Sequence, residues 1–212
     1  MQQLLLSSRA LVTDAIKQAF LALCAQSDNQ RDQIVIIVNA VDEGKRHPQV
    51  LKLQQIIQNM GFQNVTLFDV DVDDFQTLVT AKAIVISGGY EFKLVDHLKR
   101  SGMLLQLRAL INQGKPVYGI SAGAIVLGPD MDLFATLYPE DNFLPCKHAP
   151  AIQATNVYIC PHYDRQCAAD ATLANQISDW EHQQHVQVTR LNDEQGLAIH
   201  GDLVRLILWK NR

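Results

Sequence analysis

The chain has 212 residues, 48% hydrophobic and 19% charged, a composition typical of a folded protein with a sizeable core, which excludes extensive disorder. One domain over residues 1–212 is expected, because single α/β domains often reach this length. The 22 acidic residues outnumber the 18 Lys and Arg residues and no basic block is present, so we expect no nucleic-acid partner.

The N-terminal segment begins apolar but carries no basic region and no run long enough for a signal peptide or a membrane span. The cysteines form no C-x-x-C pair and do not indicate a disulfide scaffold; they are Cys24, Cys146, Cys160 and Cys167. We therefore expect reduced thiols in a cytoplasmic protein without a membrane partner, either a monomer or a homodimer.

The first 120 residues alternate between apolar, β-branched runs and segments of helical period. Continuous apolar runs are typical of strands buried on both faces, as in a parallel sheet. The predicted strands are residues 4–8, 34–40, 64–70, 81–89 and 115–120. The predicted helices are a segment capped by Thr13 and running to Leu23, residues 49–61, and one or two helices within residues 91–114.

Beyond Pro129 the pattern weakens, and residues 132–156 are assigned mostly to a long loop. Residues 157–160 resume as a strand, and a helix is predicted over residues 169–184. Short strand-like runs follow at residues 186–191, 196–201 and 203–208. Strands that alternate with helices predict an α/β fold, a doubly wound, mainly parallel sheet with helices on both faces.

The stretch GISAG, Gly119 to Gly123, has the form G-x-S-x-G and joins a predicted strand to a small, apolar segment that can begin a helix. In such a turn the glycines avoid clashes, and the serine is held in an unfavourable backbone conformation with its hydroxyl outward. Ser121 is therefore a candidate nucleophile. An ordinary turn or capping serine is the alternative, and the pentapeptide alone does not separate the two.

A serine hydroxyl becomes a good nucleophile only when a base removes its proton. Among the seven histidines His162 is the best candidate, because it follows an apolar strand and a proline and is expected at the carboxyl edge of the sheet. A solvated loop histidine is its alternative interpretation. His182 and His185 have no acidic or Cys partner at ligand spacing, so we expect no metal and no cofactor.

An acidic group should orient the imidazole, and Asp193 lies in a predicted turn between two strand-like runs, where Glu194 competes with it. An ordinary acidic turn is the alternative for both. For a developing oxyanion, the backbone N–H of Ala122 is one predicted donor. The turn at Gly88 and Gly89 is another, because glycine lets the backbone come close, although a plain strand-to-helix turn explains these two residues equally well.

Three segments in this order, ISGGYEFKLVDHLKRSG, GKPVYGISAGAIVLGPD and CPHYDR, resemble the peptidase E (aspartyl dipeptidase) family of serine peptidases. The resemblance covers nearly the whole chain, and GISAGAIVLGP is its most specific part. It implies an α/β fold related to class I glutamine amidotransferase domains, with a serine where those enzymes carry cysteine. It also implies that Ser121 is the nucleophile, His162 the base and Asp193 the acidic third member.

The chain departs from the family at two places that line the substrate site there. Tyr90 stands where family members usually have Asn, and DMDLFATLYPEDN replaces a polar stretch containing Asn and Asp, which puts aspartyl specificity in doubt. Tyr90 and Arg165 are the predicted substrate-binding residues, Arg165 because a guanidinium suits a carboxylate. A surface arginine paired with Asp164 or Asp170 is the alternative for Arg165.

The sequence therefore predicts an intracellular serine peptidase that cleaves short peptides, including those with an acidic first residue, through an acyl-enzyme on Ser121. The expected partner is a small peptide substrate. An esterase or amidase that uses the same triad on another small substrate is a second hypothesis. A third is a non-catalytic binding module, against which the presence of both Ser121 and His162 argues.

Overall fold

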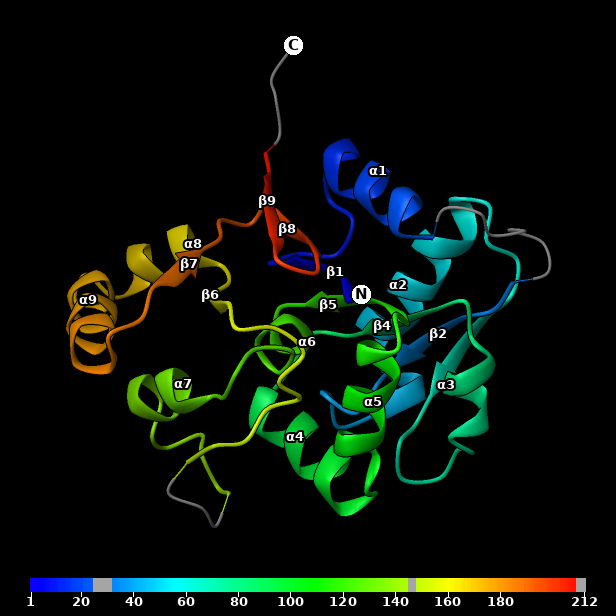
Figure 1. Ribbon diagram of the computed structural model, residues 1–212, viewed down its shortest axis with the longest axis horizontal. Helices are drawn as coiled ribbons and strands as arrows, with labels where there is room; N and C mark the ends of the chain where they lie inside the picture. The colour runs from blue at the N-terminus through cyan, green and yellow to red at the C-terminus, as the bar shows by residue number, and fades with distance from the viewer. Residues whose placement is uncertain (25–31, 145–147, 209–212) are drawn as a thin grey trace.

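The computed structural model describes residues 1–24, 32–144 and 148–208, and its centre is a seven-stranded sheet (Figure 1). The strands lie in the order β3-β2-β4-β5-β1-β8-β9, and the first five of this order run parallel. β8 and β9 are antiparallel additions at one edge. The strands are β1 (Gln3–Ser7), β2 (Ile34–Ile37), β3 (Val65–Phe68), β4 (Ala83–Ile86), β5 (Pro116–Ile120), β8 (Gly196–His200) and β9 (Leu203–Ile207).

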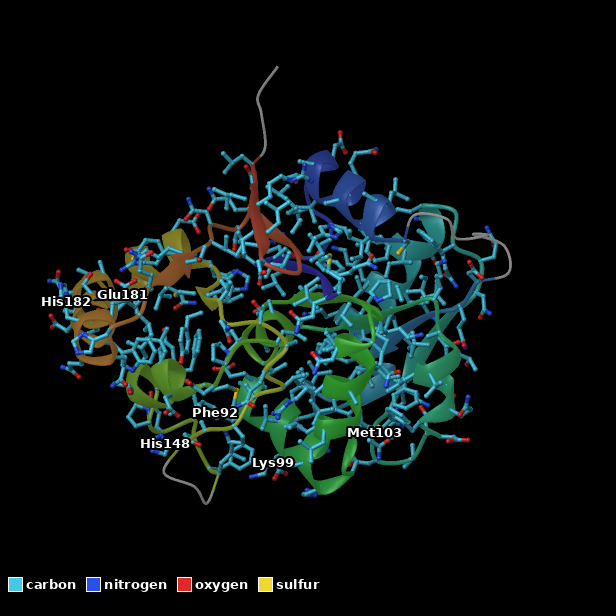
Figure 2. All side chains as sticks on the ribbon, viewed as in Figure 1. Phe92, Lys99, Met103, His148, Glu181 and His182 are labelled. Carbon is cyan, nitrogen blue, oxygen red and sulfur yellow. The ribbon has the colours of Figure 1, made fainter. Side chains whose placement is uncertain are left out.

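Helices cover both faces of this sheet (Figure 1). One face packs against α1 and α2, whose apolar residues share a buried cluster with alternate residues of β2. The other face packs against the helices that follow β3 and β4, and Phe92 belongs to this second cluster (Figure 2). The helices of these layers are α1 (Asp14–Leu23), α2 (Pro48–Asn59), α3 (Gln76–Thr80), α4 (Glu91–Arg100) and α5 (Met103–Asn112). The predicted α/β class with a mainly parallel sheet is confirmed.

Local chemistry fixes the helix ends. The Thr13 side chain accepts a hydrogen bond from the backbone N–H of Ile16 at 3.2 Å, which caps α1. Pro48 is the first residue of α2. A backbone N–H at this position would have no acceptor within the helix, so the helix loses no hydrogen bond because proline lacks one. Gly102, with φ 74°, turns the chain between α4 and α5. A short 3-10 helix, η1 (Gly44–Arg46), precedes α2.

The remaining elements form a subsidiary layer beside the central sheet. β6 and β7 pair in parallel as a separate two-stranded sheet, flanked by α7, α8 and α9. Their bounds are β6 (Tyr158–Cys160), α7 (Asp132–Leu137), α8 (Tyr163–Ala169), α9 (Leu173–Gln184) and β7 (Val188–Arg190). His162 therefore does not follow a strand of the central sheet, as the sequence predicts, but follows a strand of this smaller one.

Two other predictions about elements need correction, and one short helix has no prediction. The segment expected to be mostly loop contains α7, whose Leu133 and Phe134 are buried and whose Asp132 carboxylate accepts the N–H of Ala149 at 2.7 Å. The helix expected from residue 169 starts at Leu173, and α8 precedes it as a separate helix. The short α3 was not predicted at all, because five residues are too few to establish a helical period.

Candidate active site

Ser121 occupies the turn between β5 and α6 (Ala122–Ile125), with φ 50° and ψ −115°. A positive φ is unfavourable for a residue that carries a Cβ atom. The turn is held by its backbone: the N–H of Ser121 donates to Ser7, and the carbonyl of Ser121 accepts from Ala124 and Ile125, at 2.9, 2.9 and 3.0 Å. The strained serine turn that the G-x-S-x-G pattern predicts is therefore present.

The two glycines of the pattern let the turn pack against β4. A Cβ atom at Gly119 would lie 2.6 Å from the carbonyl oxygen of Gly123, and one at Gly123 would lie 2.2 Å from the carbonyl oxygen of Ile86. Only glycine fits at such distances. The same packing brings Ser121 to the end of β4, because a Cβ atom at Gly88 would lie 3.1 Å from the Cβ of Ser121.

His162 directly precedes α8 and takes the left-handed backbone conformation, with φ 58°. Its backbone N–H donates to Ser8 Oγ at 3.1 Å, and the Ser8 hydroxyl donates to the carbonyl of Leu191 at 2.9 Å. Ser8 thus links the end of β1 to the ends of β6 and β7. The imidazole Nε2 lies 3.0 Å from Ser121 Oγ, a hydrogen-bonding distance over which the hydroxyl proton can pass to the ring.

Asp193 lies on the other side of the imidazole. Its Oδ1 is hydrogen-bonded to Nδ1 of His162, and the two side chains are only 15% (His162) and 20% (Asp193) exposed. An ionised aspartate holds the proton on Nδ1 and leaves Nε2 free to accept from Ser121. Glu194 is exposed and makes no polar contact with the part of the chain that the structure describes. The structure thus brings Asp193, and not Glu194, to the ring.

Backbone donors lie next to Ser121. The N–H groups of Gly88, Gly89 and Ala122 donate no hydrogen bond to any residue within the described ranges. Gly89 has φ 148°, and a Cβ atom there would lie 2.2 Å from the carbonyl oxygen of Ala40, so this close approach requires glycine. α6 has only four residues, and its dipole is therefore weaker than the sequence leads one to expect. Free N–H groups, rather than a long helix, are available to an oxyanion here.

A hollow of about 500 Å³ contains Ser121, His162, Gly88 and Gly89. Three cationic side chains line it as well: Arg9, Lys52 and Arg165. All three are exposed. Among the described residues, no carboxylate pairs with Lys52 or Arg165, and the carboxylate nearest to Arg9 is that of Asp193, whose Oδ2 lies 4.0 Å from an Arg9 nitrogen. Arg165 is thus not paired with Asp164 or Asp170, and this hollow is suited to an anionic group.

Tyr90 lies elsewhere. It is 63% exposed and lines a neighbouring hollow of about 510 Å³ together with Lys93 and Phe143, rather than the hollow that holds Ser121 and Arg165. Although Tyr90 directly follows Gly89, the structure therefore places it outside the hollow that contains Ser121, His162 and Arg165.

Cys160 lies two residues before His162, but burial raises the pKa of its thiol to about 12, so it is not a thiolate at neutral pH. Burial raises the pKa of Cys24 to about 12 as well. Cys24, Cys160 and Cys167 are free thiols, and Cys146 lies outside the described residues.

Within residues 1–24, 32–144 and 148–208, no three His, Cys, Asp or Glu side chains group closely enough to hold a metal ion. His182 is exposed on α9 at the periphery of the molecule, where its Nδ1 lies 2.7 Å from the carbonyl oxygen of Ser178 (Figure 2). Among the helices described, none is long and apolar enough to cross a membrane.

The sequence reasoning missed Arg9, Lys52, Ser8 and Glu91 as residues around Ser121. Ser8 and Arg9 directly follow β1, so their place after a buried strand could have suggested them. Lys52 lies inside α2, and no local pattern distinguishes it from a solvated helix residue. Glu91 opens α4 directly after Tyr90, and the sequence predicts a substrate contact only for Tyr90.

A parallel α/β sheet, a serine in a strained strand-to-helix turn, and a histidine between this serine and an aspartate define the class of α/β proteins with a serine nucleophile turn. The model of peptidase family S51 matches residues 4–207, and the chain belongs to this family.

The relatives are distant. An uncharacterized peptidase of Pasteurella multocida (strain Pm70) is 30% identical over 86 residues, which span 41% of this chain and 42% of that protein. Peptidase E of Actinobacillus pleuropneumoniae serotype 5b (strain L20) is 33% identical over 86 residues, 39% of this chain and 34% of the relative. The chain thus aligns with less than half the length of these curated relatives.

Solved structures share the fold along most of the chain. A candidate peptidase E protein from Listeria monocytogenes EGD-e superimposes with a TM-score of 0.78 at 20% identity, covering 97% of this chain and 98% of that one. A peptidase from an acI-B1 Actinobacterium gives a TM-score of 0.67 at 14% identity, covering 98% and 87%. At these identities the likeness establishes the fold alone.

Proposed function

We propose that the protein is a serine-type peptidase that hydrolyses short peptides through an acyl-enzyme on Ser121. Membership of family S51 supports peptide hydrolysis. The observation that carries the mechanism is the continuous contact from Ser121 Oγ through the two ring nitrogens of His162 to Asp193.

In this mechanism Ser121 Oγ attacks the scissile carbonyl carbon while its proton passes to Nε2 of His162. The protonated imidazole gives this proton to the leaving amine as the C–N bond breaks, which leaves the acyl group esterified to Ser121. Water then attacks the ester while one of its protons passes to Nε2, and His162 gives this proton to Ser121 Oγ as the carboxylic acid leaves. Asp193 stabilises the imidazolium through Nδ1.

The backbone N–H of Ala122, with Gly88 or Gly89, supplies the oxyanion donors in this proposal. They donate to no described residue, and fixed donors at the position of developing charge lower the barrier.

The cationic hollow supports peptides with an acidic first residue as substrates. Arg165 and Lys52 line the same hollow as Ser121 and pair with no described carboxylate, whereas Arg9 lies 4.0 Å from Asp193, so a carboxylate near the scissile bond would meet positive charge there. A charge-assisted hydrogen bond to such a carboxylate contributes about 1.5–3 kcal/mol.

A fluorophosphonate reagent tests the nucleophile. We expect it to label Ser121 in the folded protein, located by peptide mass mapping, and to leave Ser121→Ala unlabelled although that variant keeps the wild-type circular dichroism spectrum. Absence of labelling in the folded wild type would overturn the proposal.

A peptide panel tests the substrate class. We expect hydrolysis of an Asp-first dipeptide with a kcat/KM at least about 10-fold above that of the Asn-first peptide, which differs only in charge. Equal values for the two peptides contradict the acidic preference but leave peptide hydrolysis in place. Hydrolysis of simple esters with no turnover of any peptide favours an esterase instead.

A further inference from the structure

A second, smaller hollow also reaches the proposed nucleophile. Its volume is about 170 Å³, and Ser121 and His162 line it together with Glu91, Tyr138 and Asp141. No Lys or Arg of the described residues lines it, whereas three line the larger hollow. Ser121 thus stands where a cationic hollow and an anionic hollow meet.

Glu91 is the half-buried acid of this smaller hollow. It is the first residue of α4, and burial raises the pKa of its carboxyl, with a further contribution from the charge of Asp141. The backbone N–H of Glu91 itself acts in the opposite direction but does not cancel the effect of burial. A partly desolvated carboxylate is thus retained beside the serine.

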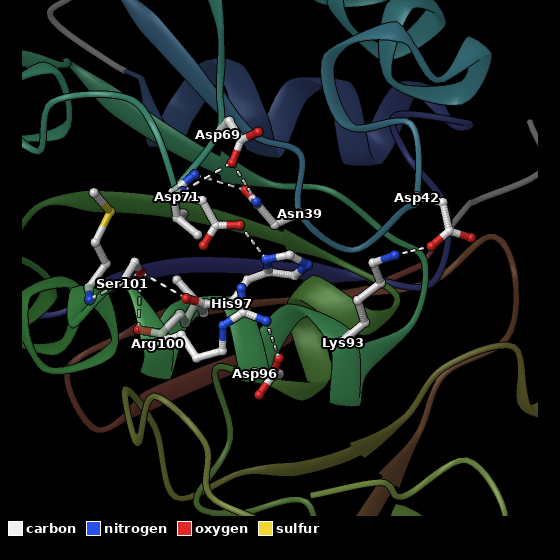
Figure 3. Close-up of polar contacts among 12 residues, drawn as sticks. Asn39, Asp42, Asp69, Asp71, Lys93, Asp96, His97, Arg100 and Ser101 are labelled. Atoms are coloured by element: carbon white, nitrogen blue, oxygen red, sulfur yellow. Dashed lines mark hydrogen bonds and ion pairs between the residues drawn. The ribbon is translucent and has the colours of Figure 1, made fainter.

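No cationic side chain compensates this carboxylate within the described part of the chain. Figure 3 shows the polar contacts of α4: Lys93 pairs with Asp42 and Arg100 with Asp96, and His97 is hydrogen-bonded to Asp71. Lys93 and Arg100 are thus directed to other acids, and Lys99 is exposed near the far end of the helix.

The walls of the hollow suit a cation too. The rings of Phe134 and Tyr138, both of which line it, are stacked with centroids 6.4 Å apart, and aromatic faces attract ammonium and guanidinium groups. The Tyr138 hydroxyl donates to Gln166 Oε1 at 2.8 Å, and burial raises the pKa of Tyr138, so this side chain stays neutral.

We propose that Glu91 binds a positively charged group of the peptide while the scissile carbonyl is held at Ser121. This inference rests on the proposed peptidase function and makes Glu91 a specificity-determining residue. Two groups of a short peptide have this chemistry: the α-ammonium of the first residue, two covalent bonds from the scissile carbonyl carbon, and a basic side chain on the residue after the scissile bond. Either places a cation within the hollow that contains the nucleophile.

The experiment compares wild type and Glu91→Gln with paired peptides that share the same acidic first residue. One pair has a free or an acetylated amino terminus, and the other has Lys or norleucine after the scissile bond. For the pair that contains the recognised cation, we expect Glu91→Gln to lower kcat/KM of the charged peptide by about 10-fold or more and to change that of its neutral partner less than about 2-fold.

The pair that responds identifies the source: a response to acetylation assigns the α-ammonium, and a response to norleucine assigns the basic side chain.

Glu43→Gln, which removes an exposed acid that lines neither hollow at Ser121, is the matched control and should leave every ratio unchanged. Glu91→Asp, which keeps the charge but withdraws it by one methylene, should give an intermediate ratio and serves as a second variant if the glutamine does not fold.

A uniform loss over all peptides, or unchanged ratios in an enzyme that still labels at Ser121 and hydrolyses dipeptides, overturns the role of Glu91 alone. A folded wild type that neither labels nor hydrolyses any peptide overturns the proposed function and this inference together.

Discussion

At the scale of single residues, the site depends on two side chains that take unusual backbone conformations. Ser121 and His162 both have positive φ, 50° and 58°, and both are held by hydrogen bonds to the segment that ends β1. Strain of this kind persists only where the surroundings impose it. The surroundings here are Ser7 and Ser8, which are 0% and 1% exposed.

The contact between Asp193 and His162 leads to a prediction with a built-in control. Asp193→Asn should lower kcat by roughly 10³–10⁴-fold, because an amide no longer fixes the tautomer or stabilises the imidazolium. Glu194→Gln, one residue away and exposed, should stay within about 2-fold of wild type. Steady-state kinetics on one dipeptide checks both, and comparable losses in the two variants would remove Asp193 from its proposed role.

At the scale of elements, the sequence reveals some parts of the fold better than others. The parallel strands are recognisable because all four residues of β2 and of β4 are buried, which requires unbroken apolar runs. β6 and β7 have three residues each, and nothing in so short a run indicates whether its partner is the central sheet or another short strand.

The same limit applies to the candidate site. The serine turn is visible locally, because its glycines are required by contacts within a few residues and with the adjacent strand. The cationic hollow is not, because its members come from the end of β1, from α2 and from α8 and meet only in the folded chain. Local patterns predict turns and buried strands; they do not predict which exposed charges meet.

The close packing of α6 on β4 predicts the effect of one added methyl group. Gly123→Ala would place a Cβ 2.2 Å from the carbonyl oxygen of Ile86, and it should lower the free energy of unfolding by about 1–3 kcal/mol or more and slow fluorophosphonate labelling of Ser121. Gly102→Ala is the control: it meets no atom within 4 Å, and its φ of 74° alone should cost about 1–2 kcal/mol without affecting labelling. Denaturant titrations and labelling rates measure both. Equal labelling rates in the two variants would show that the Ser121 turn does not depend on this contact.

At the scale of the whole molecule, the ends of the parallel strands and the subsidiary layer meet at one place. Arg9, Gly88 and Ser121 follow β1, β4 and β5, while His162 and Asp193 follow β6 and β7. The formal net charge of -4 is not spread evenly around this place, since cations line the larger hollow and acids the smaller one. A peptide that carries both signs of charge can therefore be oriented by the two hollows.

The uncompensated acid at Glu91 also affects the stability of the whole chain. The folded-state pKa of Glu91 is raised by burial and by Asp141, whereas the unfolded chain has an ordinary glutamate pKa of about 4.3. Between these two pKa values the folded state binds more protons than the unfolded state. The free energy of unfolding of the wild type therefore falls as the pH rises from the lower value to the higher one. Glu91→Gln lacks this loss, because its side chain does not ionise.

We therefore expect Glu91→Gln to be more stable than wild type at neutral pH, with the difference shrinking as the pH falls through the folded-state pKa of Glu91 and becoming small below about 4. Urea unfolding at a series of pH values measures it, with Glu43→Gln as the exposed control. Asp141 and Tyr138 line the same hollow and interact with the charge of Glu91, so the difference between the two proteins reports the ionisation of Glu91 together with its effect on these two neighbours. A gain in stability that is the same at every pH would mean that residue 91 acts through packing or hydrogen bonding, and the electrostatic basis for cation binding at this position would then be lost.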